Sequence, residues 1–183
     1  MVCLADSSAS PDGRLVLRSG DAAIPMHPPT DIALGNDVQV LAPSTLHPDE
    51  WRSFVSQARD SIALPFSPKR VEVIGTLSRK ILSHPRLRRD TAAVALGFWL
   101  RPSNLARYEN EFRQLCSGTC RVPAGLVFHI APANVDTMFV YSWTLAFLTG
   151  NANILRLSTR TSELVGDLLE CINDVFAEYQ EAC

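Results

Sequence analysis

The residues most suited to binding a ligand follow two short apolar runs in the second half of the chain. Ala131–Asn134 follows the run GLVFHI, and Ser158–Thr161 follows the run NILRL. Both runs have the length of a strand, and the longer apolar stretch between them predicts a helix. Strand, helix and strand in this order form one right-handed βαβ unit. Ligands of such sheets bind beyond the carboxyl ends of the strands, so both segments are predicted to face a ligand.

The sequence also predicts where the strands and helices around these two segments begin and end. We expect adjacent parallel strands near residues 125–130 and 153–157, and helices over about 135–149 and 162–180. Gly150-Asn151 ends the first helix, as a left-handed cap does. Neither strand alternates cleanly between apolar and polar residues, which is typical of a parallel sheet covered on both faces.

Cysteine and histidine side chains show no metal-binding spacing. Cys116 and Cys120 are separated by three residues, but no second pair follows at a zinc-site distance. Cys171 lies on the apolar face of the last predicted helix, which indicates a core residue. His129 is predicted to be a hydrogen-bonded strand histidine, not a catalytic base. No metal is expected.

Composition narrows the class of protein. The chain has 183 residues, a net charge of −2 and 46% hydrophobic residues, as in an ordinary globular protein without a basic surface for nucleic acid. Its N-terminus lacks a signal-peptide pattern, and its longest nearly uncharged stretch is interrupted by Pro132, Asp136 and Gly150. We therefore expect a cytoplasmic protein with reduced cysteines, no membrane span and no nucleic-acid partner.

Residues 1–47 are predicted to form an N-terminal arm. Residues 1–13 are small and polar, which predicts a disordered end. Arg14–Arg18 predicts a short strand. Ile32–Leu34 and Val38–Leu41 flank a Gly-Asn-Asp turn and predict a hairpin.

Residues 48–120 are predicted to form a helical block. Helical spacing indicates a first helix over about 51–62, a second that starts at Pro68 and ends before Pro85, a third over about 87–100 and a fourth after Pro102. The third is apolar nearly all round, which predicts that it is buried. Residues 121–183 then begin the α/β domain.

The common phosphate-loop motifs and the GxSxG nucleophile elbow do not occur in the sequence. Periodicity and composition alone therefore predict only a cytosolic α/β domain and leave nucleotide binding open. More specific are PAGLVFHIAPAN at 123–134 and LTGNANILRLS at 148–158, which resemble the aldehyde dehydrogenase superfamily. The resemblance is closest to the LuxC-type acyl-CoA reductases, it includes FWLRPSNLARYENEF at 98–112, and it covers roughly residues 68–181.

The resemblance implies a fold and an activity. The fold would be aldehyde-dehydrogenase-like α/β, with an incomplete Rossmann-type parallel sheet preceded by a helical block and an N-terminal β arm. The activity would be reduction of a fatty acyl thioester to an aldehyde. Asn134 matches the asparagine whose amide stabilises the oxyanion formed by thiolate attack, a catalytic role. The alternative for Asn134 is a helix N-cap.

The resemblance also implies a dinucleotide cofactor. The cofactor-binding positions would be Ala131, Pro132, Ala133, Arg156, Ser158 and Thr159. Arg156 stands where the superfamily usually has a lysine that reaches the ribose, although an exposed basic residue is the alternative. Thr159 stands where NAD-preferring relatives often carry a glutamate. With that carboxylate missing and Arg160 nearby, the resemblance favours NADP(H).

Two departures from the family pattern matter. Asp136 replaces a proline, although an acid suits a helix N-terminus. The family's nucleophilic cysteine lies in a later domain, and none of the five cysteines matches it. The expectation is a chain truncated before the catalytic domain and inactive alone.

Two functions follow as alternatives. The first is the cofactor-binding part of an NADPH-dependent reductase acting on an acyl-CoA or acyl-protein thioester. The second is a non-catalytic α/β module that binds a nucleotide or a partner protein. A homo-oligomer and a partner subunit both stay open.

Overall fold

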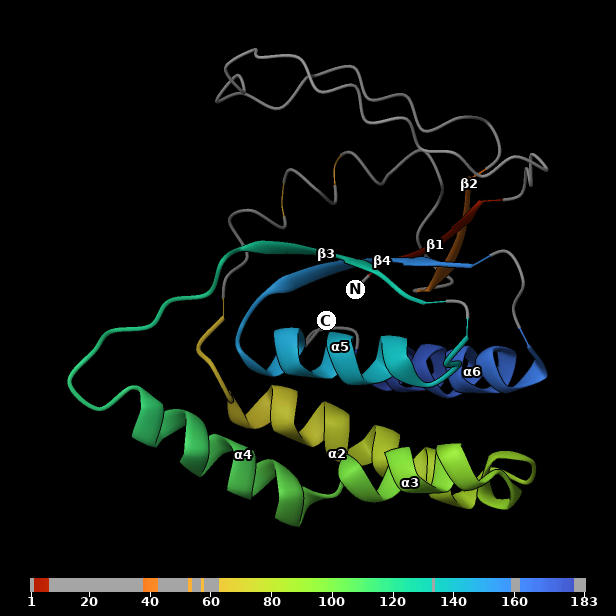
Figure 1. Ribbon diagram of the computed structural model, residues 1–183, viewed down its shortest axis with the longest axis horizontal. Coiled ribbons are helices and arrows are strands. Elements are labelled where there is room, and N and C mark those ends of the chain that lie inside the picture. Colours follow the sequence, from red (N-terminus) through yellow and green to blue (C-terminus); the bar gives the residue numbers. More distant parts are fainter. Residues whose placement is uncertain are drawn as a thin grey trace.

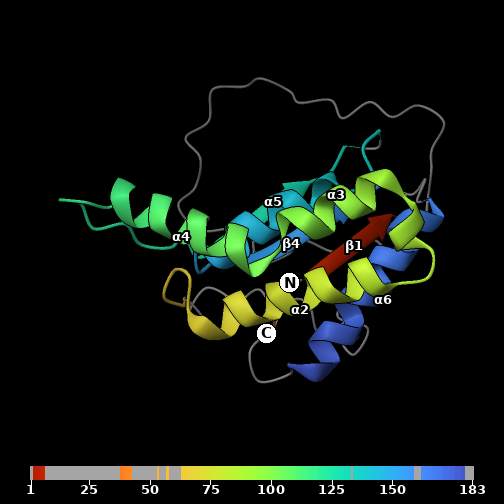
Figure 2. The same ribbon diagram turned by 90° about the horizontal axis from the view of Figure 1, so that it is seen from below.

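The computed structural model describes residues 2–6, 38–42, 53, 57, 63–132, 134–158 and 162–179. In these residues a four-stranded sheet lies above helices α5 and α6, and α2, α3 and α4 form an outer layer below them (Figure 1). The view from below shows the outer helices in front of α5 and the sheet (Figure 2). The described part of the chain is therefore a layered α/β structure.

The elements in chain order are β1 Val2–Asp6, β2 Val38–Ala42, α2 Pro68–Ser83, the 3₁₀ helix η2 Leu87–Arg89, α3 Thr91–Trp99, α4 Pro102–Leu115, β3 Leu126–Ile130, α5 Met138–Leu148, β4 Ala152–Leu157 and α6 Glu163–Glu178.

The sheet has the strand order β2-β1-β4-β3. Strands β3 and β4 run parallel, with Leu126 opposite Ala152 and Ile130 opposite Arg156. The predicted pair of adjacent parallel strands is thus confirmed, as are the helices that follow each of them. Strand β1 also runs parallel to β4, and it pairs antiparallel with β2.

The prediction of a disordered N-terminus was wrong for Val2–Asp6, which forms the strand between β2 and β4. The partner of this strand lies about 150 residues away in the sequence, so no local pattern could reveal the pairing. The predicted strand at 38–41 is confirmed as β2, but its partner is β1. The other predicted strands, Arg14–Arg18 and Ile32–Leu34, lie outside the described residues.

The helical block follows the sequence pattern with one correction. Helices α2 and α4 begin at the predicted prolines, Pro68 and Pro102. The single helix predicted over about 87–100 is instead divided at Asp90 into η2 and α3. The Asp90 side chain caps α3 by accepting a hydrogen bond from the Ala93 N–H at 2.8 Å. Of the predicted first helix, the structure describes only Ser53 and Gln57, both helical.

The prediction that the third helix is buried is correct for only one face of α3. Ala93, Leu96 and Leu100 are buried, whereas Phe98 is 43% exposed and lies under the Arg101 guanidinium, 3.7 Å from the ring centroid. Helix α3 belongs to the outer layer and packs against α2, so only one of its faces meets the core. Its apolar composition does not decide how many faces are covered.

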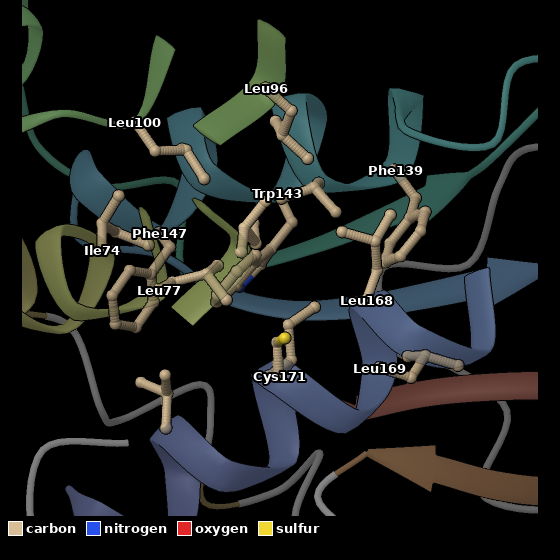
Figure 3. Packing of buried hydrophobic residues seen from close by; sticks show 14 of the residues in the cluster. Ile74, Leu77, Leu96, Leu100, Phe139, Trp143, Phe147, Leu168, Leu169 and Cys171 are labelled. Atoms are coloured by element: carbon tan, nitrogen blue, oxygen red, sulfur yellow. The ribbon is translucent and has the colours of Figure 1, made fainter. Parts of the chain in front are cut away.

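The core lies between the helix layers and the sheet. Trp143 of α5 is its largest fully buried side chain, with the Phe147 ring 5.4 Å away and the Phe176 ring 5.9 Å away, edge to face. Figure 3 shows Leu77, Leu96 and other side chains of the outer layer gathered around Trp143, with Leu168 and Cys171 of α6 on the other side. These contacts join α2, α3, α5 and α6 into one core.

Coverage of the sheet differs between its strands. Helices α5 and α6 cover one face, and Leu155 and Leu157 of β4 are buried against them. On the opposite face Ile154 is buried, but Phe128 and Ile130 of β3 are 56% and 69% exposed. The prediction of a sheet covered on both faces is therefore wrong for β3. On the same face of β4 Ile154 is buried but Arg156 is exposed, since the described residues place no helix on that side.

The predicted cap at Gly150-Asn151 is confirmed as a Schellman motif. Gly150 has φ +95°, its N–H donates to Phe147 O at 3.1 Å, and the Asn151 N–H donates to Ala146 O at 3.1 Å. The Arg70 guanidinium donates to Phe147 O at 2.5 Å and to Asn151 O at 3.1 Å. The C-terminus of α5 is thereby attached to α2.

Candidate functional site

Two hydrogen bonds join the end of β3 and the loop after it to the end of β4 and the start of α6. The Ala131 N–H donates to Arg156 O at 3.1 Å, which joins the ends of the two strands. Further on, the Ser162 hydroxyl donates to the Asp136 carboxylate at 2.6 Å. The described residues of the β3–α5 loop (131, 132 and 134–137) therefore lie beside the carboxyl end of β4 and the first turn of α6, where the parallel topology places a ligand. Residues 159–161 of the second predicted segment lie outside the described residues.

Asn134 lies exposed in the β3–α5 loop. Helix α5 begins four residues later at Met138, and its N-cap is Thr137. The N-cap alternative for Asn134 was therefore wrong. The Asn134 side chain makes no hydrogen bond to another residue that the structure describes, so nothing in that part of the chain competes with a ligand for its amide.

The cofactor positions predicted from the sequence are only partly described. Ala131 is half-buried, Pro132 is exposed and Ser158 is half-buried at the end of β4. Arg156 is exposed, and the alternation of β4 places it on the face away from α5 and α6. Ala133 and Thr159, together with Arg160, lie outside the described residues. The roles assigned to these positions stay predictions.

His129 is hydrogen-bonded on both sides, as predicted for a strand histidine. Its Nε2 lies 2.9 Å from Asn153 Oδ1, and its Nδ1 lies 2.6 Å from Ser142 Oγ. Asn153 donates its own amide to Asn151 O at 2.9 Å, which directs Oδ1 toward the ring. This arrangement suits an Nε2–H that donates to Asn153 and an Nδ1 that pairs with the Ser142 hydroxyl.

The order serine, histidine, asparagine resembles a nucleophile, its base and an orienting group. Ser142 nevertheless lies inside α5, where the neighbouring backbone N–H groups are used in helical hydrogen bonds. No backbone donor beside Ser142 is left to stabilise an oxyanion. The network instead connects β3, β4 and α5 below the site.

Asp136 is a residue whose role the sequence did not reveal. An acid near the start of α5 was expected to stabilise that helix, but its carboxylate accepts from Ser162, the N-cap of α6. Ser162 followed by Glu163 is a recognisable N-cap signal. The partnership with Asp136 joins residues 26 positions apart, and no local pattern indicates it.

One cluster of ligand-type residues lies outside the predicted site. Ligand atoms of His84, Asp167 and Glu170 are within 4.8 Å of one another. The buried Asp167 carboxylate forms an ion pair with Arg86, and His84 Nδ1 accepts from the Leu87 N–H at 3.3 Å. A cation would have to displace the guanidinium that already neutralises Asp167, so the contacts explain the cluster without a metal.

The structure describes the side chains of three cysteines, Cys116, Cys120 and Cys171. Cys171 is a buried core residue, as predicted, and burial, followed by the charges of Asp174 and Glu170, raises the pKa of its thiol to about 11. Cys116 is half-buried and Cys120 exposed, both in the segment after α4. A protonated, enclosed thiol such as that of Cys171 is a poor nucleophile.

Comparison with known proteins supports the resemblance seen in the sequence. Residues 101–179 match the family model of acyl-CoA reductase (LuxC). The matched segment runs from the start of α4 to the end of α6, so it contains the whole candidate site. The predicted resemblance to LuxC-type acyl-CoA reductases is confirmed over these residues.

No curated protein and no solved structure matched the chain. Among the helices that the structure describes, none combines the length and the apolar character needed to cross a membrane.

Proposed function

We propose that this chain is the cofactor-binding part of an NADPH-dependent reductase that converts acyl thioesters, such as acyl-CoA or an acyl-protein, to aldehydes. The observation that carries the proposal is the LuxC match over residues 101–179, which contains both loops of the site. The proposed fold is an incomplete aldehyde-dehydrogenase-like Rossmann domain over 121–183, preceded by a helical block over 48–120 and an arm over 1–47. A cytoplasmic location belongs to the same proposal.

In this proposal Asn134 donates its amide to the oxyanion of the tetrahedral intermediate. A neutral donor held in a fixed loop stabilises charge that develops in the transition state more than it stabilises the substrate. The exposure of Asn134 at the carboxyl end of β3 supports the role. Buried Cys171 is unsuited to supply the attacking thiolate, and the resemblance implies a cysteine from a later domain, in a further segment or a partner subunit.

The residues around the strand ends suit a dinucleotide. Ala131 and Pro132 present a backbone with small side chains, and Arg156 presents an exposed cation on the neighbouring strand. Together with Ala133, Ser158 and Thr159, they would hold NADPH, with the Arg156 guanidinium as a donor for a 2′-phosphate. When bound, NADPH would supply the hydride for the reduction.

The test is cofactor binding by Arg156→Glu. We expect NADPH to bind at least about tenfold more weakly, because a hydrogen bond to a charged group contributes roughly 1.5–3 kcal/mol. NADH affinity should change much less. Arg88→Glu is a matched control, since Arg88 is also exposed but belongs to η2. Equal NADPH affinity of both variants and the wild-type chain would show that Arg156 is an ordinary surface residue without a role in cofactor binding.

A second candidate is a non-catalytic module that binds a nucleotide or a partner protein. It is favoured by the burial of Cys171, which leaves that thiol unfit to attack a thioester. The candidates differ once a cysteine-bearing segment or subunit is present: the reductase should then oxidise NADPH in the presence of acyl-CoA, and the non-catalytic module should not. The chain alone should show no turnover under either candidate. Turnover by the chain alone that one cysteine-to-serine replacement abolishes would identify a nucleophile within it and exclude the non-catalytic module.

A further inference from the structure

We propose that Asp136 and Ser162 form a positioning pair that holds the β3–α5 loop, with Asn134 in it, against the first turn of α6. The functional meaning of the pair rests on the proposed function, which assigns Asn134 its role. The pair itself rests on contacts of the folded chain.

The Ser162 hydroxyl takes part in two hydrogen bonds. Its oxygen accepts from the Val165 N–H at 3.3 Å, which caps α6, and its proton goes to the Asp136 carboxylate at 2.6 Å. A hydroxyl that only caps a helix would need no acceptor of its own. The second bond therefore adds a link between α6 and the loop that leaves the neighbouring strand.

The pair completes the attachment of the loop at its two ends. At the start of the loop the Ala131 N–H donates to Arg156 O at 3.1 Å, and at its end Asp136 is bonded to Ser162. Asn134 lies three residues after the first attachment and two before the second. A shift of the Asn134 backbone would therefore strain or break at least one of these bonds.

Helix α5 does not secure the loop through its own cap. Its N-cap residue, Thr137, makes no side-chain capping hydrogen bond. The neighbouring Asp136 carboxylate instead accepts from Ser162, the N-cap residue of α6. Asp136 therefore restricts the loop through a partner on another helix.

Hydrogen exchange of the full chain tests the pair directly. In Asp136→Ala, amides of the loop should exchange about fivefold faster, the scale of one net hydrogen bond. Asp136→Asn keeps an oxygen that accepts from Ser162 and should stay close to the wild-type rate. Equal rates in Asp136→Ala and the wild-type chain, or equally raised rates in both Asp136 variants, would overturn the pair.

Ser162 supplies the second half of the test. Ser162→Ala should speed exchange in the loop and in the first turn of α6, while Ser162→Thr should restore both because it keeps the hydroxyl. In the double variant with Asp136→Ala, loop exchange should be no faster than in Ser162→Ala alone. Additive effects on the loop would show that the two residues act independently and would refute the pairing.

Titration with NADPH decides whether the pair positions the site. Because the same loop carries Ala131 and Pro132 of the proposed cofactor site, Asp136→Ala should weaken NADPH binding about fivefold, and Asp136→Asn should restore it. An unchanged affinity in Asp136→Ala, together with faster loop exchange, would overturn the positioning role. If the wild-type chain binds no NADPH, the proposed function fails, and the exchange rates alone support or overturn the pair.

Discussion

Replacement of Gly150 by alanine should destabilise the fold strongly, for two reasons visible at the end of α5. Gly150 has φ +95°, a region that residues with a side chain rarely adopt. An added Cβ would lie 2.2 Å from Ala63 O and 2.7 Å from Pro123 Cγ. The first of these neighbours is backbone and cannot rotate away as a flexible side chain would.

The expected cost combines strain with a lost hydrogen bond. Backbone strain at this φ is roughly 1–3 kcal/mol. Moving Ala63 O also breaks the hydrogen bond from the Ala63 N–H to Gly150 O, 3.2 Å long and worth about 1 kcal/mol. The lower entropy of an unfolded chain with alanine returns roughly 0.5–1 kcal/mol. The free energy of unfolding should fall by roughly 1–3.5 kcal/mol.

Urea unfolding followed by circular dichroism measures this loss, and two other glycines serve as controls. Gly125 has φ +97° but no atom within 4 Å of an added Cβ, so Gly125→Ala carries strain without a clash and should cost about 1 kcal/mol. Gly166 lies in α6 with open space around it, and Gly166→Ala should stabilise by roughly 0.5–1 kcal/mol. Equal losses in the Gly150 and Gly125 variants would refute the close approach to Ala63.

Two further predictions concern buried ionisable groups. Arg86→Met should lower the free energy of unfolding by roughly 3 kcal/mol, because it leaves the buried Asp167 carboxylate without its partner. Asp167→Asn should lower it by only about 1 kcal/mol, because the guanidinium that it leaves is mostly exposed. Equal losses in urea unfolding would contradict this. Burial raises the pKa of Cys171 from 9.0 to about 11, so the folded chain keeps a proton on this thiol that the unfolded chain loses. The contribution of Cys171 to the free energy of unfolding should therefore fall by about 2 kcal/mol between pH 9 and 11. Cys171→Ala should remove that slope, and iodoacetamide should modify exposed Cys120 well before Cys171.

The sequence predicts those helices and strands whose ends are marked by residues close by in the chain. The βαβ unit was predictable because its strands, its helix and the cap at Gly150-Asn151 are all encoded within a few residues of each element. The division of the third helix was encoded too, since Asp90 before Thr91 is an N-cap signal, but the apolar run that follows concealed it. Strand β1 was not predictable, because its place in the sheet depends on a partner distant in sequence.

The same distinction applies to the site. That two loops meet at the carboxyl ends of the strands follows from parallel topology alone. Which side chains contact each other within those loops does not follow from topology, since the contact between Asp136 and Ser162 depends on how the crossover helix packs. The cluster of His84, Asp167 and Glu170 likewise joins the end of α2 to α6 through tertiary packing.

Asn134→Ala separates the two roles that the sequence left open for this residue. As an N-cap its loss would cost about 1 kcal/mol of stability, whereas an exposed side chain without a partner among the described residues should cost less than about 0.5 kcal/mol. Ser162→Ala is the matched control, because Ser162 does cap a helix and should show the full loss. Both variants would be compared in urea unfolding under the same conditions. Equal losses would restore a capping role for Asn134 and remove the argument that its amide is available to an oxyanion.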